Sequence, residues 1–123
     1  MEMIYSYTRA QALEDGVLVD VTHTASACGL RVPVAITDTL YHGYIEASAT
    51  QAKLGQTTEG RLKDVLILLL FNAASSGRNK AEIRYPVTFL MTEDKRETIT
   101  VKAVIDGGDD GKPVITVMLE NED

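Results

Sequence analysis

The stretch EGRLKDVLILLLFNAASS, residues 59–76, decides the fold because it predicts a long helix at the centre of the core. Thr57 or Thr58 can cap its start, and Gly77 directly follows its end. Apolar side chains fall on every face of its central turns, so we expect other elements to cover it on more than one side. Its apolar run, residues 65–71, is far shorter than the roughly 20 residues that cross a bilayer, so we expect a core helix and no membrane contact.

After this helix the hydrophobic pattern changes from a helical repeat to strict alternation. Alternate residues share one face of a predicted strand: Ile83, Tyr85, Val87, Phe89 and Met91. Pro86 cannot donate to a sheet ladder, so this strand is expected at an edge or with that position facing outward. TEDKRE is expected to be a hairpin loop. Further strands over residues 98–105 and 114–119, on either side of the loop DGGDDGK, complete a three-stranded antiparallel meander.

The segment before the long helix predicts shorter elements. Thr8 and Gln11 have the spacing of a capping box, so a helix should begin there, and Gly16 can end it. The β-prone run VLVDV follows at residues 17–21, and Thr22 can cap a short second helix.

VPVAIT, residues 32–37, fits either a strand or an extended connection into a helix, and we favour the connection, leading to a helix over residues 39–52. The pattern as a whole predicts an α+β fold, in which N-terminal helices and one long core helix pack on the C-terminal three-stranded antiparallel meander. A chain of 123 residues has the length of one ordinary domain, so we expect a single domain over residues 1–123.

The composition is that of a soluble globular protein, with 45% hydrophobic and 24% charged residues. A formal net charge of −6 argues against the basic surface that nucleic-acid binding requires. Cys28 is the single cysteine, so no intrachain disulfide can form, and the start MEMIYSY lacks the pattern of a secretory signal. We therefore expect a cytoplasmic protein.

Three segments carry a resemblance to a known family. They are YTRAQALEDGVLVDVT at residues 7–22, GRLKDVL at 60–66 and ITVKAVIDGGDDGKPVITVMLENED at 99–123. On these segments the chain resembles a family of small uncharacterised bacterial proteins, a domain of unknown function often carried on plasmids, phages and other mobile elements. The resemblance implies no established reaction, cofactor or catalytic residue.

The first group of candidate site residues clusters around the distinctive N-terminal segment. Its members are polar side chains that a fold could bring together as ligand or partner contacts: Thr8, Arg9, Asp20, Thr22 and His23. His23 with Cys28 or Asp20 has the residue types of a nucleophile and base pair, although a small cysteine packed in a short helix is the favoured interpretation.

A second candidate patch is basic. Residues 61–91 carry five Lys or Arg against two Asp or Glu, and the patch comprises Arg61, Lys63, Arg78 and Lys80. These cations could meet an acidic partner, whereas solvated charges flanking an apolar helix are the usual case.

Other polar patterns point to no metal and no cofactor. His42 and Glu46 have the spacing of side chains on one helix face, yet they have no neighbouring ligand in sequence. The loop DGGDDG, residues 106–111, lacks the ligand spacing of a calcium loop and is interpreted as a hairpin turn. No phosphate-binding glycine motif occurs.

Two classes of function follow. The first is a small interaction protein that covers a surface of a host protein, as an accessory or anti-defence factor of a mobile element. The second is a small enzyme or ligand-binding domain with a site around Arg9, Asp20 and His23. Homodimerisation through the open face or edge of the meander is compatible with either class.

Overall fold

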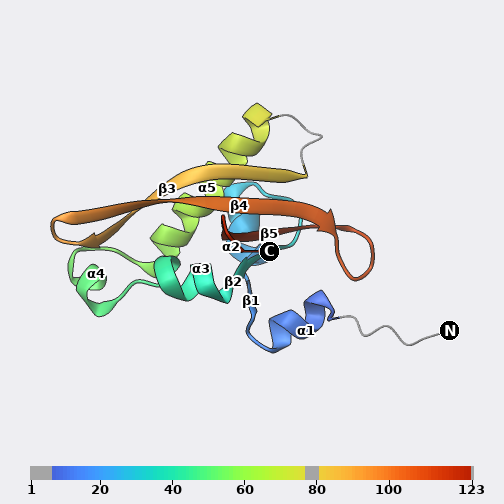
Figure 1. Cartoon of the computed structure of the whole chain (residues 1–123), viewed down its shortest axis with the longest axis horizontal. Coiled ribbons are helices and arrows are strands. Elements are labelled where there is room, and N and C mark those ends of the chain that lie inside the picture. Colours follow the sequence, from blue (N-terminus) through green and yellow to red (C-terminus); the bar gives the residue numbers. More distant parts are fainter. Residues whose placement is uncertain (1–6, 77–80, 123) are drawn as a thin grey trace.

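Over residues 7–76 and 81–122, which the computed structural model describes, the chain forms an α+β fold around a five-stranded mixed sheet (Figure 1). The helical elements are α1 (Arg9–Glu14), α2 (Thr22–Cys28), α3 (Asp38–Leu40), the π-helix η1 (Tyr41–Ile45), α4 (Ala49–Lys53) and α5 (Thr58–Ser76). The strands are β1 (Leu18–Asp20), β2 (Val34–Thr37), β3 (Glu82–Thr92), β4 (Lys95–Gly107) and β5 (Pro113–Leu119). Their order across the sheet is β1-β2-β5-β4-β3.

The expected three-stranded meander is wrong as a description of the sheet. β3, β4 and β5 do pair antiparallel in sequence order, but β5 also pairs with β2, and this second pairing is parallel. VPVAIT is therefore a strand and not a connection. Val34 and Ile36 are fully buried, so this short apolar run lacks the alternation that marks a half-exposed strand.

The expected helix over residues 39–52 is also wrong. The segment instead contains α3, the π-helix η1 and α4. Ser48 begins α4 with a capping box to Gln51, so its side chain stabilises a new helix start where a continuous helix was expected. Thr37 caps α3 through its side chain, which accepts from the amide of Leu40.

The expected start and end of the first helix and the expected end of the second are confirmed, whereas the second helix begins one residue earlier than expected. Thr8 and Gln11 form the capping box of α1, and Gly16, with a φ of 78°, takes the left-handed conformation after it. Gly29 ends α2 in the same way, with a φ of 105°. Thr22 is the first residue of α2 and not its cap.

α5 begins at the expected position and provides the centre of the core. It packs against β3 on one side and α2 on another. The hydroxyl of Tyr85 in β3, which is 1% exposed, donates to the carbonyl of Val65 at 2.9 Å. Coverage of the helix is less complete than its sequence predicts, because Ile67 is 41% and Phe71 67% exposed.

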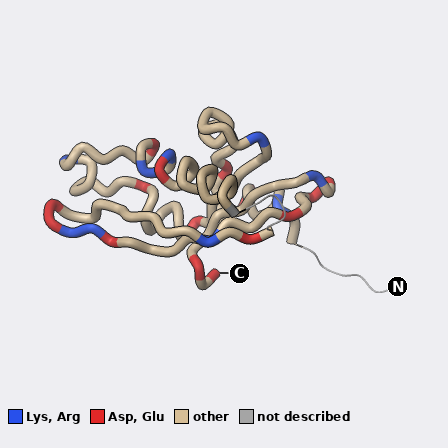
Figure 2. Tube along the Cα trace, turned by 90° about the horizontal axis from the view of Figure 1, so that it is seen from above, with Lys and Arg blue, Asp and Glu red and all other residues tan. Residues whose placement is uncertain are grey.

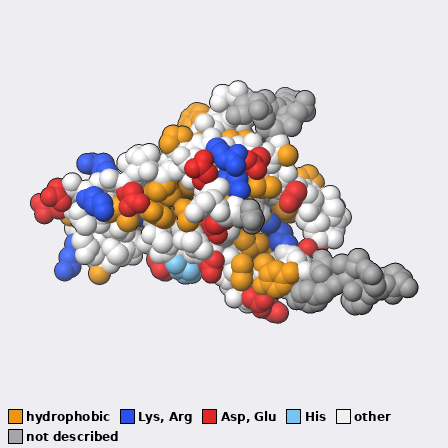
Figure 3. All heavy atoms as spheres, viewed as in Figure 1, with side chains coloured by type: hydrophobic (Ala, Val, Ile, Leu, Met, Phe, Trp, Pro, Cys, Tyr) orange, Lys and Arg blue, Asp and Glu red, His pale blue; other side chains and the backbone are white. Residues whose placement is uncertain are grey.

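The two faces of the sheet have different surroundings. The face toward α5 is apolar, and the final turn of the chain lies on the opposite side, as the view from above shows (Figure 2). On that opposite side β3 and β4 are uncovered, with Arg84 paired to Glu82 and Glu120, and with Thr88 bonded to Thr98. Hydrophobic, charged and other side chains are mixed over this surface (Figure 3), which we call the open face. Among the described helices, none combines the length and apolar character that crossing a membrane requires.

Candidate functional site

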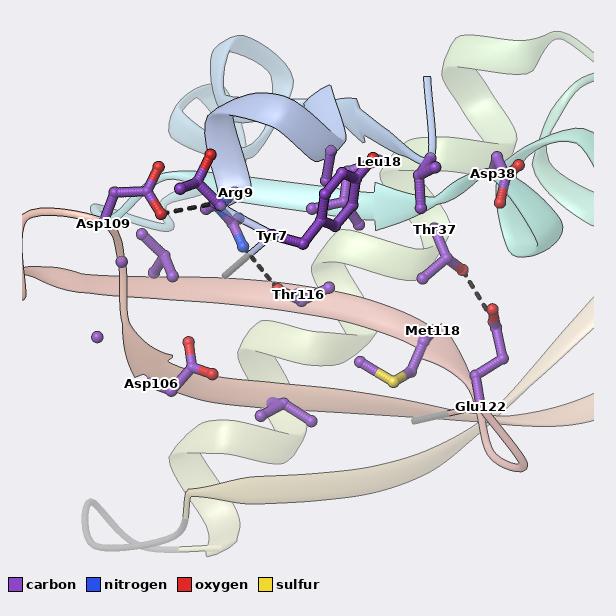
Figure 4. A pocket seen from close by; sticks show the side chains of 17 residues that line it. Tyr7, Arg9, Leu18, Thr37, Asp38, Asp106, Asp109, Thr116, Met118 and Glu122 are labelled. Atoms are coloured by element: carbon purple, nitrogen blue, oxygen red, sulfur yellow. Dashed lines mark hydrogen bonds between the residues drawn. The ribbon is translucent and has the colours of Figure 1, made fainter. Parts of the chain in front are cut away.

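A cleft of about 580 Å³ lies between α1 and the sheet, on the face opposite α5. We call it the α1 cleft, and Figure 4 shows its surroundings. It is lined by residues of five regions, namely α1 and its approach (Tyr7, Thr8, Arg9, Ala12), the β1 side (Val17, Leu18), the end of β2 (Thr37, Asp38), the β4–β5 hairpin (Val104, Asp106, Gly107, Gly108, Asp109, Val114, Thr116, Met118) and the final turn (Glu122). Segments from both ends of the sequence therefore build one site.

The cleft is apolar at its base and acidic at its rim. Val104, Val114 and Met118 belong to the sheet and supply the base. The charged side chains of the lining are four carboxylates and one guanidinium: Asp38, Asp106, Asp109, Glu122 and Arg9. The site therefore has an excess of negative charge beside an apolar surface.

Arg9 joins α1 to β5 across the cleft. Its Nη1 donates to Oγ1 of Thr116 at 2.7 Å, and its Nη2 donates to the carbonyl of Ile115 at 2.8 Å. Partial burial lowers the pKa of Arg9, while the nearby carboxylates of Asp106, Asp20 and Asp109 oppose that shift. The guanidinium is thus held by the fold and compensates only part of the acidic rim.

Asp109 is a second tie between α1 and the sheet. Its carboxylate accepts the backbone amides of Arg9 at 2.9 Å and Ala10 at 3.0 Å, the first two amides of the helix. These hydrogen bonds to the charged form lower the pKa of Asp109. The β4–β5 loop, which the sequence suggested was only a turn, also caps a helix from the other end of the chain.

Glu122 closes the cleft at the opposite end. Its Oε2 accepts from the hydroxyl of Thr37 at 2.9 Å and from the amide of Leu119 at 2.8 Å. Lys102, which is only 8% exposed, donates from Nζ to the carbonyl of Glu122. Figure 4 shows Glu122 directed toward Thr37, so the final turn is fixed to β2 and β4.

Two carboxylates of the rim are weakly engaged by hydrogen bonds within the described residues, although Asp106 interacts electrostatically with Arg9. Asp38 interacts with the hydroxyl of Thr39 at a long 3.5 Å, and no hydrogen bond or ion pair within residues 7–76 and 81–122 reaches the carboxylate of Asp106. Figure 4 places them on different sides of the cleft. Their oxygens can accept hydrogen bonds from a bound cation.

The five N-terminal candidates are divided between different places. Thr8 and Arg9 line the α1 cleft, whereas Asp20, Thr22 and His23 do not. Asp20 accepts from the amide of Thr22 at 3.1 Å and from its hydroxyl at 2.5 Å, which stabilises the start of α2. His23 is exposed on that helix.

The residues of the basic patch also differ from one another. Arg61 is 2% exposed, and its guanidinium donates to the carbonyls of Tyr44 and Leu90, the closest contact being 2.6 Å. Lys63 is on the surface, 3.7 Å from Glu59. Arg78 and Lys80 lie outside the described residues.

His42 and Glu46, the pair weighed as metal ligands, lie on the surface, with Nδ1 of His42 3.2 Å from a carboxylate oxygen of Glu46. In the part of the chain that is described, no group of three or more His, Cys, Asp or Glu side chains could hold a metal ion.

The acidic members of the cleft were not predicted from the sequence, because Asp38, Asp106 and Glu122 are far apart in the chain. The alternation of Val104 with Asp106 was the available signal, but the predicted strand ended at residue 105 and Asp106 was assigned to the hairpin turn. β4 extends to Gly107, so both side chains lie on one face of the sheet.

The fold is α+β, with the α1 cleft on one face of a mixed sheet. The chain belongs to the family of unknown function DUF6573, whose model matches residues 1–123. The resemblance to an uncharacterised family is thereby confirmed. No similar protein was found among curated proteins or among solved structures.

Proposed function

We propose that this protein is a binding module that holds a basic segment of a partner protein in the α1 cleft and performs no chemical turnover. The observation that carries the proposal is the charge of the lining, four carboxylates against one guanidinium that β5 already binds. A Lys or Arg side chain matches this arrangement, because its stem is apolar and its end is a cation.

The chemistry of such a contact follows from the two available carboxylates. Cationic groups of the segment would bind both Asp38 and Asp106, and an aliphatic stem would lie on Met118 and Val104. The formal charge of −6 on the whole chain also favours association with a basic partner.

The alternative, an enzyme or ligand-binding domain around Arg9, Asp20 and His23, has less support. Arg9 is bonded to β5, and Asp20 is bonded to the first residue of α2, so both side chains have structural partners.

A role as an accessory or anti-defence factor of a mobile element rests on the family resemblance. A single domain over residues 1–123 rests on chain length.

Affinity capture from a bacterial lysate, followed by titration of the captured partner, tests the proposal. We expect Asp38→Asn and Asp106→Asn each to weaken binding by about tenfold, since each removes one charge-assisted contact. Glu93→Gln is the matched control, because Glu93 is exposed in the β3–β4 turn away from the cleft.

Arg9→Ala is a poor test because it also removes the bonds that hold α1 to β5. Equal affinity of the Asp38→Asn, Asp106→Asn double variant and the wild type would contradict the proposal. An acidic partner that binds the wild type through other residues would contradict it as well.

A further inference from the structure

The strand β4 is longer than the strand beside it. It pairs with β3 from Lys95 to Val104, but with β5 only from Val101 to Gly107. The part of β4 before Val101 therefore has a strand on one side only, and the β3–β4 arm extends past the end of β5 (Figure 1).

The register shows which backbone groups this edge presents. The amide of Ile105 donates to Ala81 beside β3, and the amide of Glu120 donates to the carbonyl of Thr100 on the other side. Because the direction alternates along a strand, Arg96 and Thr98 direct both their N–H and C=O groups toward the side where β5 has ended. Four backbone hydrogen-bonding groups thus face outward.

The free edges of β3 and β4 in this arm differ in how far they are protected from pairing with another strand. On β3, Pro86 has no N–H, and the carbonyls of Leu90 and Met91 accept from Arg61 at 2.8 Å and from Gln51 at 3.3 Å. Proline and bound carbonyls are devices that prevent an edge strand from pairing. Within the described chain, the β4 edge at Arg96 and Thr98 has neither device.

A groove runs beside this unprotected edge. It has a volume of about 430 Å³ and is lined by Tyr44, Ile99, Thr100, Leu119, Glu120 and Asn121. Tyr44 is fixed as its wall, because its hydroxyl donates to Glu97 at 2.7 Å and its ring lies 5.5 Å from that of Phe89. On the side of the edge toward α5, the apolar contacts that the groove offers are the side chains of Tyr44, Ile99 and Leu119.

The other side of the same edge belongs to the open face and is polar. Thr98 is exposed there, and so is Arg96, for which no ion pair with another described residue is found. An added strand would direct alternate side chains into the groove and toward Arg96.

We propose that the free edge of β4 at Arg96 and Thr98 takes up an extended segment of a partner protein as an added strand, in line with β5. The segment has apolar residues facing Tyr44 and Leu119 and an acidic residue facing Arg96. Main-chain hydrogen bonds supply the affinity, and the alternating side chains supply the selectivity. This surface is separate from the α1 cleft, and the inference does not depend on the function proposed for that cleft.

The first test uses a peptide of about six residues with capped termini, in which valine alternates with glutamate. The peptide is titrated into the full chain, and the amide signals of the chain are followed by NMR. We expect the amides of Arg96 and Thr98 to become protected from hydrogen exchange. A peptide in which lysine replaces glutamate should bind more weakly, because it places a cation beside Arg96.

The second test removes one outward N–H. Thr98→Pro should weaken peptide binding by about tenfold or more. Thr88→Pro is the matched control, because Thr88 lies directly opposite Thr98, is also exposed, and directs its N–H to the β3 edge. If Thr98→Pro does not fold, a peptide N-methylated at alternate residues tests the same bonds on the wild-type chain.

Several results would overturn the proposal. They are equal binding by Thr98→Pro and wild type, equal binding by the N-methylated peptide, and protection that appears at β3 and not at β4. A dimer of the chain that protects Arg96 and Thr98 without peptide would identify a second copy as the occupant and would also overturn it. Asp106→Asn should leave peptide binding unchanged, which separates this test from that of the α1 cleft.

Discussion

Asp109 caps the helix that begins at Arg9, although the two residues are 100 positions apart in the chain. The carboxylate accepts the amides of Arg9 and Ala10, and the guanidinium of Arg9 in turn reaches β5. The β4–β5 hairpin and α1 therefore hold each other in place, and the wall of the α1 cleft depends on both contacts.

Asp109→Asn should lower the midpoint of thermal unfolding at neutral pH. The folded-state pKa of Asp109 is lowered by its two amide donors, so the stabilisation is present above the unfolded-state pKa and is lost as pH falls through the folded-state pKa. The difference in the midpoint of thermal unfolding between the variant and the wild type should therefore disappear in acid. Thermal unfolding followed by circular dichroism at neutral and acidic pH can show this. Glu93→Gln should show no such pH-dependent difference, and a constant difference for Asp109→Asn would contradict the assignment.

Arg61→Met should reduce the free energy of unfolding by about 2–4 kcal/mol, because it leaves two buried carbonyl acceptors without their donor. These carbonyls belong to Tyr44 and Leu90. Lys63→Met, on the exposed side of the same helix, should change it by less than about 1 kcal/mol. Urea unfolding measures the free energy of unfolding of both variants. Similar losses for the two would show that the hydrogen bonds of Arg61 do not stabilise the fold.

Tyr85→Phe should cost about 1 kcal/mol at neutral pH through loss of the bond to Val65. Burial raises the pKa of Tyr85, so its contribution is present below the unfolded-state value of about 10 and is lost as pH rises toward the folded-state value. The variant should consequently lose less stability than wild type in alkali. Tyr41→Phe is the control. Urea unfolding at neutral and alkaline pH measures how much stability each variant loses in alkali, and equal losses for the two variants would contradict the prediction.

Pro86→Val should increase self-association. Pro86 lies opposite Thr100 in the β3–β4 pair, at a position whose N–H would point away from β4. Valine restores a donor on the β3 edge and favours strand pairing between molecules. Analytical ultracentrifugation should detect dimers or larger species for this variant but not for Thr88→Val, which leaves the backbone donors of the edge unchanged.

Local signals in the sequence predicted most individual elements. The capping box at Thr8, the left-handed Gly16 and the long apolar run of α5 each depend on neighbouring residues, and each is confirmed. The alternation from Ile83 to Met91 likewise predicted β3. Pro86 predicted either an edge strand or an outward-facing position, and β3 lies at an edge of the sheet.

Features that depend on distant pairing could not be predicted in this way. β2 pairs with β5, whose residues follow it by about eighty positions, and its buried apolar run has no helical or alternating period. The α1 cleft is a more extreme case, because Asp38, Asp106 and Glu122 meet only after the sheet has formed. Arg61 shows the reverse error, since its cation was expected to meet a partner or solvent, whereas it is buried and donates to carbonyls inside the fold.

The position of β5 has a consequence for the order of folding during synthesis. This strand follows the other four in the chain but lies in the middle of the sheet, between β2 and β4. Until the ribosome has released Pro113–Leu119, the β1–β2 and β3–β4 pairs are two separate antiparallel pairs, and isolated pairs of strands are marginally stable. The nascent chain therefore exposes the inner edges of both pairs to other proteins until β5 emerges, and the five-stranded sheet forms only after all its strands have been released.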